Sequence, residues 1–411
     1  MSMTAWLKCI GPASFTALFL LLLPPPLRGQ AGPFPDAHDP PPSGWTGPVF
    51  KLRQDYPATL PTGEPKPWKN FDFKTQPLEY IRSVLGYCLE GNVDVNWQVE
   101  RNSVRAWYHA PWMHSTNNGR EFVHGLTRER SSVPRELHPD QSSSFQNWAV
   151  SVYNAPGGFV IGQVWKNPNS PNAAAAVFPD GTVAVKLLFS TATVAQVPYL
   201  QGSVEWQAHI YKNAQVTQRT IETVQLLQVD VAVRDSRADS TTGWVFGTFV
   251  YDGSAAGATP WQRMVPVGVM WGNDPQITSP TATATTQLTQ TFINPNIGPP
   301  QHLGRAKRLN GPVDNPRSSC LSCHSTSEYH QISGMVPGAN LSNTQTMRWF
   351  QNIKAAQAFD AGEQSLDYSL QLAVGIQRFL QAHPSAVVTT APAAAGGPSK
   401  HAHRRFATVH R

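Results

Sequence analysis

Charged residues are scarce in this sequence. Asp, Glu, Lys and Arg make up 14% of the 411 residues, whereas a typical soluble domain has about 25%. The four cysteines are too few for a disulfide-rich secreted scaffold. After residue 31 no apolar run reaches the ~20 residues that a membrane-spanning helix needs. The hydrophobic content of 40% is still sufficient for a packed core, which excludes wholesale disorder.

The net charge of +6 comes entirely from the two ends of the chain. Lys8 and Arg28 lie in the first 31 residues, and four basic residues lie in the segment 385–411. Neither end contains Asp or Glu, so the body between them is neutral. Binding to nucleic acid requires clustered Lys and Arg to neutralise phosphates. The sequence therefore excludes nucleic acid as the main partner.

Residues 1–31 are typical of a secretory signal peptide. Lys8 supplies the positive charge, residues 13–23 form the apolar region, and Pro24–Pro26 break any helix. Gly29–Ala31 provide small residues for cleavage. The alternative, a membrane anchor, is disfavoured because the apolar run is too short to span a bilayer. We therefore expect export to the periplasm, with no membrane span in the mature chain.

The remaining cysteines contain one specific motif. Cys9 is removed with the signal peptide and Cys88 stands alone, but Cys320, Cys323 and His324 form the sequence C-x-x-C-H. This is the attachment motif for c-type haem. Two thiols one helical turn apart can add to the two haem vinyl groups, and the adjacent imidazole can bind the iron.

Three other interpretations of the motif remain open. A thioredoxin-like dithiol should follow a strand, but residues 309–317 are typical of a loop. A zinc site needs a fourth ligand, which His330 or His302 would have to supply. A structural disulfide between Cys320 and Cys323 is the third alternative.

At these residues the chain resembles the exported bacterial c-type cytochromes, over residues 301–384. The resemblance implies one covalent haem c with its iron, and His324 as an axial ligand. It also implies a class I-like α-helical fold and electron transfer with an unidentified redox partner protein. A helical stretch at residues 365–382 matches the closing helix of that family.

The sixth iron ligand has several candidates. Met347 lies between the motif and the closing helix, which is the order found in the family, so we favour it over Met335. Met335 lies in a Gly/Pro loop that could present its sulfur to the iron. His330 is a third candidate, and an open sixth position is the remaining alternative.

Composition changes divide the chain into segments. Residues 32–74 are a Pro-rich extended segment, residues 75–300 a β-rich domain, residues 301–384 the cytochrome domain, and residues 385–411 a disordered tail. The 36 prolines argue against a mostly helical protein, and the 13 tryptophans favour sheet. We expect residues 1–31 to be cleaved, so the mature chain begins with the Pro-rich segment.

Hydrophobic periodicity predicts the elements of the β-rich domain. A helix is expected over residues 75–90, followed by about eight or nine strands. The strands are expected within residues 93–100, 145–153, 159–165, 182–189, 204–211, 227–233, 244–251 and 264–271. Short strands at this spacing predict an antiparallel sandwich or barrel.

Residues 105–130 concentrate polar and aromatic side chains. They form either a pocket for a small ligand or a loop that packs the sheet against the haem domain, and we favour the loop. The residues concerned are Arg105, Trp107, Tyr108, His109, Trp112, His114, Arg120, Glu121, His124, Arg128, Glu129 and Arg130.

The sequence thus predicts a multidomain α+β protein. An N-terminal antiparallel β-sandwich or barrel-like domain precedes a small all-α cytochrome c-like domain. The expected function is covalent haem c binding and single-electron transfer outside the cytoplasm. The alternatives are a haem-dependent oxidoreductase with a pocket in the β domain, and a haem-based sensor of small ligands.

Overall fold

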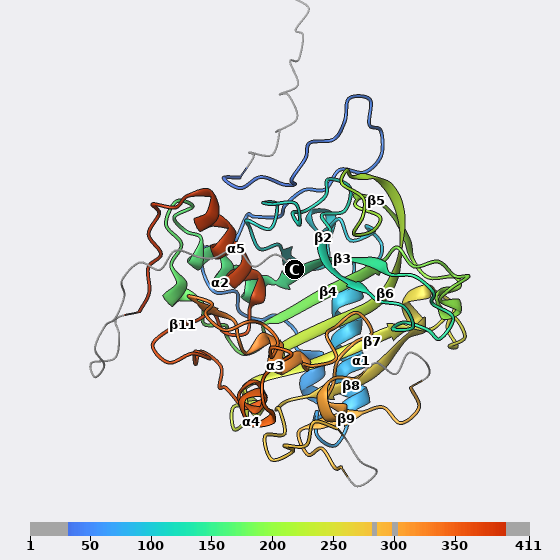
Figure 1. Ribbon diagram of the computed structural model, residues 1–411. Helices are drawn as coiled ribbons and strands as arrows, with labels where there is room; N and C mark the ends of the chain where they lie inside the picture. Colours follow the sequence, from blue (N-terminus) through green and yellow to red (C-terminus); the bar gives the residue numbers. More distant parts are fainter. Residues whose placement is uncertain (1–31, 282–285, 298–302, 392–411) are drawn as a thin grey trace, which may run out of the picture. The chain divides into compact units, whose positions relative to one another are not determined.

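A single antiparallel sheet of nine strands dominates the computed structural model, which describes residues 32–281, 286–297 and 303–391 (Figure 1). The strand order is β1-β3-β4-β6-β7-β8-β9, with β2 paired to β3 and β5 to β6. The strands are β1 (Trp107–Tyr108), β2 (Thr127–Ser132), β3 (Phe145–Asn154), β4 (Val183–Ser190), β5 (Glu205–Ile210), β6 (Thr220–Arg234), β7 (Trp244–Tyr251), β8 (Met264–Met270) and β9 (Thr291–Ile293).

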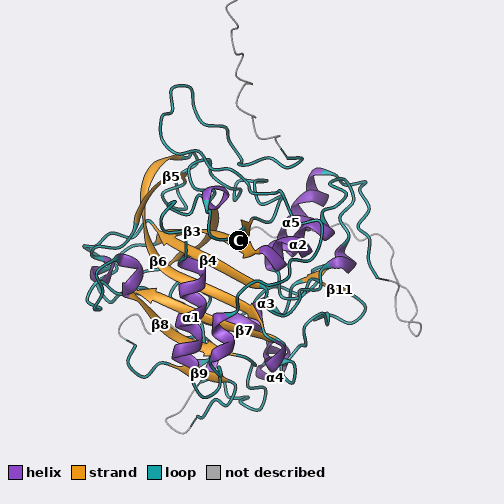
Figure 2. Cartoon of the chain, turned by 180° about the vertical axis from the view of Figure 1, so that it is seen from behind, coloured by secondary structure: helices purple, strands orange, loops and turns teal. Residues whose placement is uncertain are grey.

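Helix α1 (Pro77–Leu89) covers one face of this sheet (Figure 2). Its Tyr80, Ile81 and Val84 are fully buried. Gly247 of β7 makes this packing close, because a Cβ there would lie 2.1 Å from the Cδ1 atom of Ile81. The apolar face of the helix and the glycine in the strand are therefore both needed for this close contact.

The opposite face carries α2 (Ala155–Val164), α3 (Cys320–His324) and α5 (Leu370–Ala382), as Figure 1 shows. Asn154 caps α2, since its side chain accepts a hydrogen bond from the Gly157 amide. Ser369 caps α5 in the same way. The remaining elements are α4 (Asn343–Thr346) and a small pair of strands, β10 (Glu328–Tyr329) and β11 (Gln364–Ser365).

The expected fold class is wrong. The structure has one large sheet with helices on both faces instead of a sandwich or barrel, and it has no separate small all-α domain among the described residues. Leu321 of α3 and Phe379 of α5 share one apolar cluster with Phe246 of the sheet. Because the C-terminal segments build their core on the sheet, the resemblance to class I cytochromes is wrong as well.

Several individual elements also differ from the sequence prediction. Residues 93–100 form turns and the start of a short 3-10 helix (Val99–Arg101), because Asn96 and Trp97 adopt left-handed backbone conformations with φ of 49° and 60°. Residues 159–165, expected as a strand, belong mostly to α2, whose start is fixed by the Asn154 cap. The expected helices over 75–90 and 365–382 are confirmed as α1 and α5, the latter beginning later, at Leu370.

No helix within the described residues is long and apolar enough to cross a bilayer. Residues 1–31, predicted to be a signal peptide, and residues 392–411 of the predicted tail lie outside the described residues. The described residues from Pro33 onward group into one compact unit.

Candidate functional site

Helix α3 presents the C-x-x-C-H motif. The Ser319 hydroxyl accepts from the Ser322 amide at 3.1 Å, and the Ser322 hydroxyl accepts from the Ser319 amide at 2.7 Å. This reciprocal capping box makes Ser319 the N-cap, so the helix begins at Cys320. The Ser319 hydroxyl also donates to Asn273 Oδ1 at 3.0 Å. The short helix is thus fixed to the loop after β8.

Both thiols of the motif are free and protonated. Cys320 is buried, with its Sγ atom 3.7 Å from Thr248 Oγ1, while Cys323 is half-buried. Burial raises the pKa of Cys320 well above its usual value and that of Cys323 to about 12, with Asp314 adding to both. A thioredoxin-like dithiol needs a lowered thiol pKa, so this environment disfavours that interpretation.

His324 has one ring nitrogen in use. Its Nδ1 atom lies 2.9 Å from the Tyr368 carbonyl oxygen, which can only accept, so Nδ1–H is the donor. Burial lowers the pKa of His324 to about 4, so the ring is neutral and Nε2 carries a lone pair. The ring packs 4.8 Å from the Phe246 ring. In this tautomer Nε2 can bind a metal while the Nδ1–H group is held by a carbonyl, an arrangement common among metal-binding histidines.

A row of polar side chains crosses the sheet beside Phe246. Strand pairing aligns Ser151 of β3, Lys186 of β4, Asp230 of β6 and Thr248 of β7. They occupy the face that carries α3 and α5, two residues along from an apolar row that contains Phe246. We call these four residues the polar row.

The polar row has strong internal electrostatics. Thr248 Oγ1 donates to Asp230 Oδ1 at 2.8 Å, and Gln228 Nε2 donates to Asp230 Oδ2 at 2.8 Å and to Asp314 Oδ2 at 3.0 Å. Burial, followed by the Asp314 charge, raises the pKa of Asp230 to about 7. Lys186 Nζ lies 3.1 Å from Glu129 Oε1.

These charges extend to the motif. Burial lowers the pKa of Lys186, but the Glu129, Asp314 and Asp230 carboxylates more than offset it and raise the pKa overall. The same Lys186 charge acts on Cys323 and His324. The polar row therefore belongs to the electrostatic environment of the C-x-x-C-H motif.

The candidate sixth ligands lie in different surroundings. Met347 is buried in a separate apolar cluster with Trp349, Phe350 and Phe359. Met335 is 43% exposed in its loop. His330 Nδ1 is 3.1 Å from Glu363 Oε2.

The residue cluster at 105–130 is divided by the structure. Glu129 joins the polar row through Lys186, and Arg130 donates to the Val313 and Asp314 carbonyl oxygens at 2.8 and 2.9 Å. Trp107 and Tyr108 form β1, and Arg128 of β2 donates to Gln146 of β3. Others stabilise loops at a different place. Glu121, for example, accepts from the amides of Val123, His124, Leu126 and His209.

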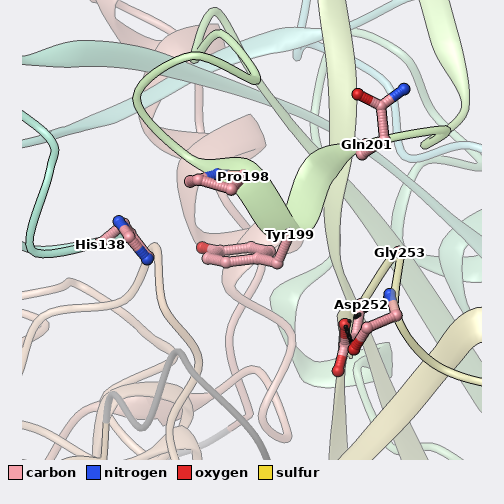
Figure 3. A pocket seen from close by; sticks show the side chains of 7 residues that line it. His138, Pro198, Tyr199, Gln201, Asp252 and Gly253 are labelled. Atoms are coloured by element: carbon pink, nitrogen blue, oxygen red, sulfur yellow. Dashed lines mark hydrogen bonds between the residues drawn. The ribbon is translucent and has the colours of Figure 1, made fainter.

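A metal site and a surface pocket are two further kinds of site to consider in the part of the chain that the structure describes. It contains no group of three or more His, Cys, Asp or Glu arranged to hold a metal ion. A surface pocket, drawn in Figure 3, has a volume of about 460 Å³. At this pocket the Asp252 carboxylate accepts a hydrogen bond from the Ser254 hydroxyl at 2.6 Å. The pocket shares no residue with the motif or the polar row, and is lined by His138, Pro198, Tyr199, Gln201, Asp252, Gly253 and Ser254.

The sequence prediction missed Lys186, Asp230 and Thr248. Lys186 and Asp230 are the polar positions of alternating strands, and such positions usually face solvent. The signal that could have found them is that these polar positions align with one another across adjacent strands once the strands pair. Only the packing of α3 and α5 over that face places them beside the motif.

Comparison with known proteins adds no relative. No protein-family model, curated protein or solved structure matches this chain.

Proposed function

We propose that this chain binds one haem c covalently and takes part in single-electron transfer outside the cytoplasm. Cys320 and Cys323 would carry the two thioether bonds, and His324 would bind the iron through Nε2. The haem would thus be attached to a short helix that packs on a β-sheet. It rests on one observation: two free thiols one helical turn apart stand beside a neutral histidine whose Nδ1–H is already bonded.

Part of the motif is accessible to a haem, while Cys320 is buried against Thr248 of β7. Cys323 and His324 are only half-buried, so the edge of α3 that carries them is accessible. The His324 hydrogen bond fixes the imidazole orientation and increases its basicity, as in other metal-binding histidines. Phe246 supplies an apolar contact that limits water near the imidazole.

Haem iron would supply the one-electron couple between the ferric and ferrous states. The role of this chain is to hold the imidazole and to set the local charge. Asp314 and Glu129 on one side and Lys186 on the other act on the motif in opposite directions. The signal peptide supports a periplasmic location, where a redox partner protein would exchange the electrons.

Expression of the full chain with a cytochrome-maturation system tests this function. The haem should remain with the polypeptide after acid and organic-solvent extraction, and its pyridine haemochrome spectrum should be that of a haem with two thioethers. Haem that is extracted freely, or a purified chain without haem, would refute the proposal.

The polar row favours a second candidate function, haem-dependent chemistry or sensing with a small ligand. The row places an ammonium group and a carboxyl group beside the motif, and such groups donate or accept protons near a reacting centre. Tight binding of carbon monoxide to the reduced protein would favour this function. A six-coordinate reduced haem that binds carbon monoxide poorly would favour the electron carrier.

A further inference from the structure

Asp367 is a buried carboxylate with three donors from distant parts of the chain. It is 1% exposed, and its Oδ2 atom accepts from the Phe178 amide at 2.7 Å. Its Oδ1 atom accepts from the Trp244 indole N–H at 2.9 Å and from the Ala356 amide at 3.1 Å. These bonds connect the loop before α5 to β7 and to two other loops.

The backbone at this position is unusual. Asp367 and the next residue, Tyr368, adopt left-handed conformations with φ of 48° and 66°. Such conformations cost free energy in residues other than glycine, so the surrounding contacts must hold them. The Asp367 carboxylate and the bond from its own amide to Ser365 Oγ, at 3.1 Å, supply those contacts.

This backbone conformation points the Tyr368 carbonyl group toward His324. The Tyr368 carbonyl oxygen accepts the hydrogen bond from His324 Nδ1–H at 2.9 Å. The Tyr368 hydroxyl donates to the Ile353 carbonyl oxygen at 2.5 Å, which holds the other end of the side chain. Asp367 therefore fixes the peptide that selects the tautomer of His324.

We propose that Asp367 is a positioning residue for His324, acting through the Tyr368 carbonyl to keep Nε2 free and the imidazole basic. The effect of Asp367 on the haem iron rests on the proposed function. Its structural part, the control of the His324 tautomer, holds for the chain itself.

Asp367→Ala in the haem-loaded protein tests the consequence. Without the carboxylate the Tyr368 carbonyl should lose its position, the Nδ1–H bond should weaken, and the imidazole should become less basic. A less basic ligand favours ferric iron less, so we expect the midpoint potential to shift upward while the haem remains covalently attached. The electron paramagnetic resonance signal of the ferric haem should broaden or change its g values.

Asp367→Asn is the second variant, in case Asp367→Ala does not fold. Its amide oxygen can still accept from Trp244 and Ala356, but its NH2 group cannot accept from the Phe178 amide. We expect a smaller upward shift than in Asp367→Ala.

Glu121→Gln is the matched control. Glu121 is also a fully buried carboxylate that accepts backbone amides, and its partners Val123 and Leu126 are remote from His324 in the chain. Its substitution should lower stability and leave the potential unchanged. Lower stability with an unchanged potential and signal in both Asp367 variants would overturn the proposal.

Nitrogen-15 nuclear magnetic resonance of the chain with labelled histidine separates this inference from the proposed function. Haem content of the wild-type protein decides the proposed function. If the chain carries no haem, the ring nitrogens of His324 still report the tautomer. Nδ1–H should dominate in the wild type and give way to a mixture in Asp367→Ala. The same tautomer in both would refute the role of Asp367.

Discussion

The Cys320 Sγ atom lies 3.7 Å from the Thr248 hydroxyl oxygen, a contact between the motif helix and the middle of the sheet. Thr248 in turn donates to Asp230. The first cysteine of the motif is therefore placed against the polar row, and the sheet is part of the candidate site. This arrangement differs from the independent helical domain that the sequence suggested.

Cys320→Ser and Cys323→Ser should each reduce the yield of covalent haem strongly, because each removes one thioether. The amount of haem that remains with the polypeptide after acidic organic extraction measures this. Cys88→Ser serves as the thiol control, since Cys88 is buried among residues of the α1 face, in a different cluster from Cys320. Equal haem contents in all three variants would contradict attachment at the motif.

Met347→Ala should lower the free energy of unfolding by about 2–5 kcal/mol, because it leaves a cavity in a buried cluster. Met335→Ala should change it little, since that side chain is 43% exposed. We expect the haem spectrum of both variants to match the wild type, because the ring against which His324 packs, Phe246, lies in a different apolar cluster from Met347, and Met335 is exposed in its loop. Loss of a far-red sulfur-to-iron absorption band in either variant would instead identify that methionine as the sixth ligand.

Local signals were sufficient for some elements and insufficient for the fold. The apolar periodicity of α1 and α5 involves residues only three or four positions apart, so these helices could be predicted from the local sequence. Strand alternation shows only that a face is covered, and a helix layer or a second sheet demands the same pattern. The polar row depends on what lies above Lys186 and Asp230, which is a property of long-range packing. The positive φ of Asn96 and Trp97 likewise has no simple sequence signal.

Removal of residues 385–411 should lower stability, in contrast to removal of residues 392–411. Thr389 donates its amide to the Pro171 carbonyl oxygen at 3.0 Å and accepts from the Ala173 amide at 2.8 Å. Each such bond contributes about 1 kcal/mol, so the longer deletion should cost about 2 kcal/mol more in denaturant unfolding. Equal stabilities would show that this docked segment contributes nothing.

Asp230→Asn should change how stability depends on pH. Burial and the Asp314 charge raise the pKa of Asp230 from 3.8 to about 7 in the folded state. Below the unfolded value both states are protonated, so the wild type carries no penalty. As the pH rises toward 7, the unfolded chain ionises first and wild-type stability falls.

The asparagine variant lacks this loss. Its stability relative to the wild type should therefore increase between pH 4 and pH 7 and level off above the folded pKa. Since one pKa unit corresponds to about 1.4 kcal/mol, the relative gain should exceed ~1 kcal/mol. Denaturant unfolding of both proteins at several pH values measures it, with Asp252→Asn, at a half-buried turn position outside the polar row, as the control. A difference between variant and wild type that does not vary with pH would show that Asp230 ionises normally beside the motif.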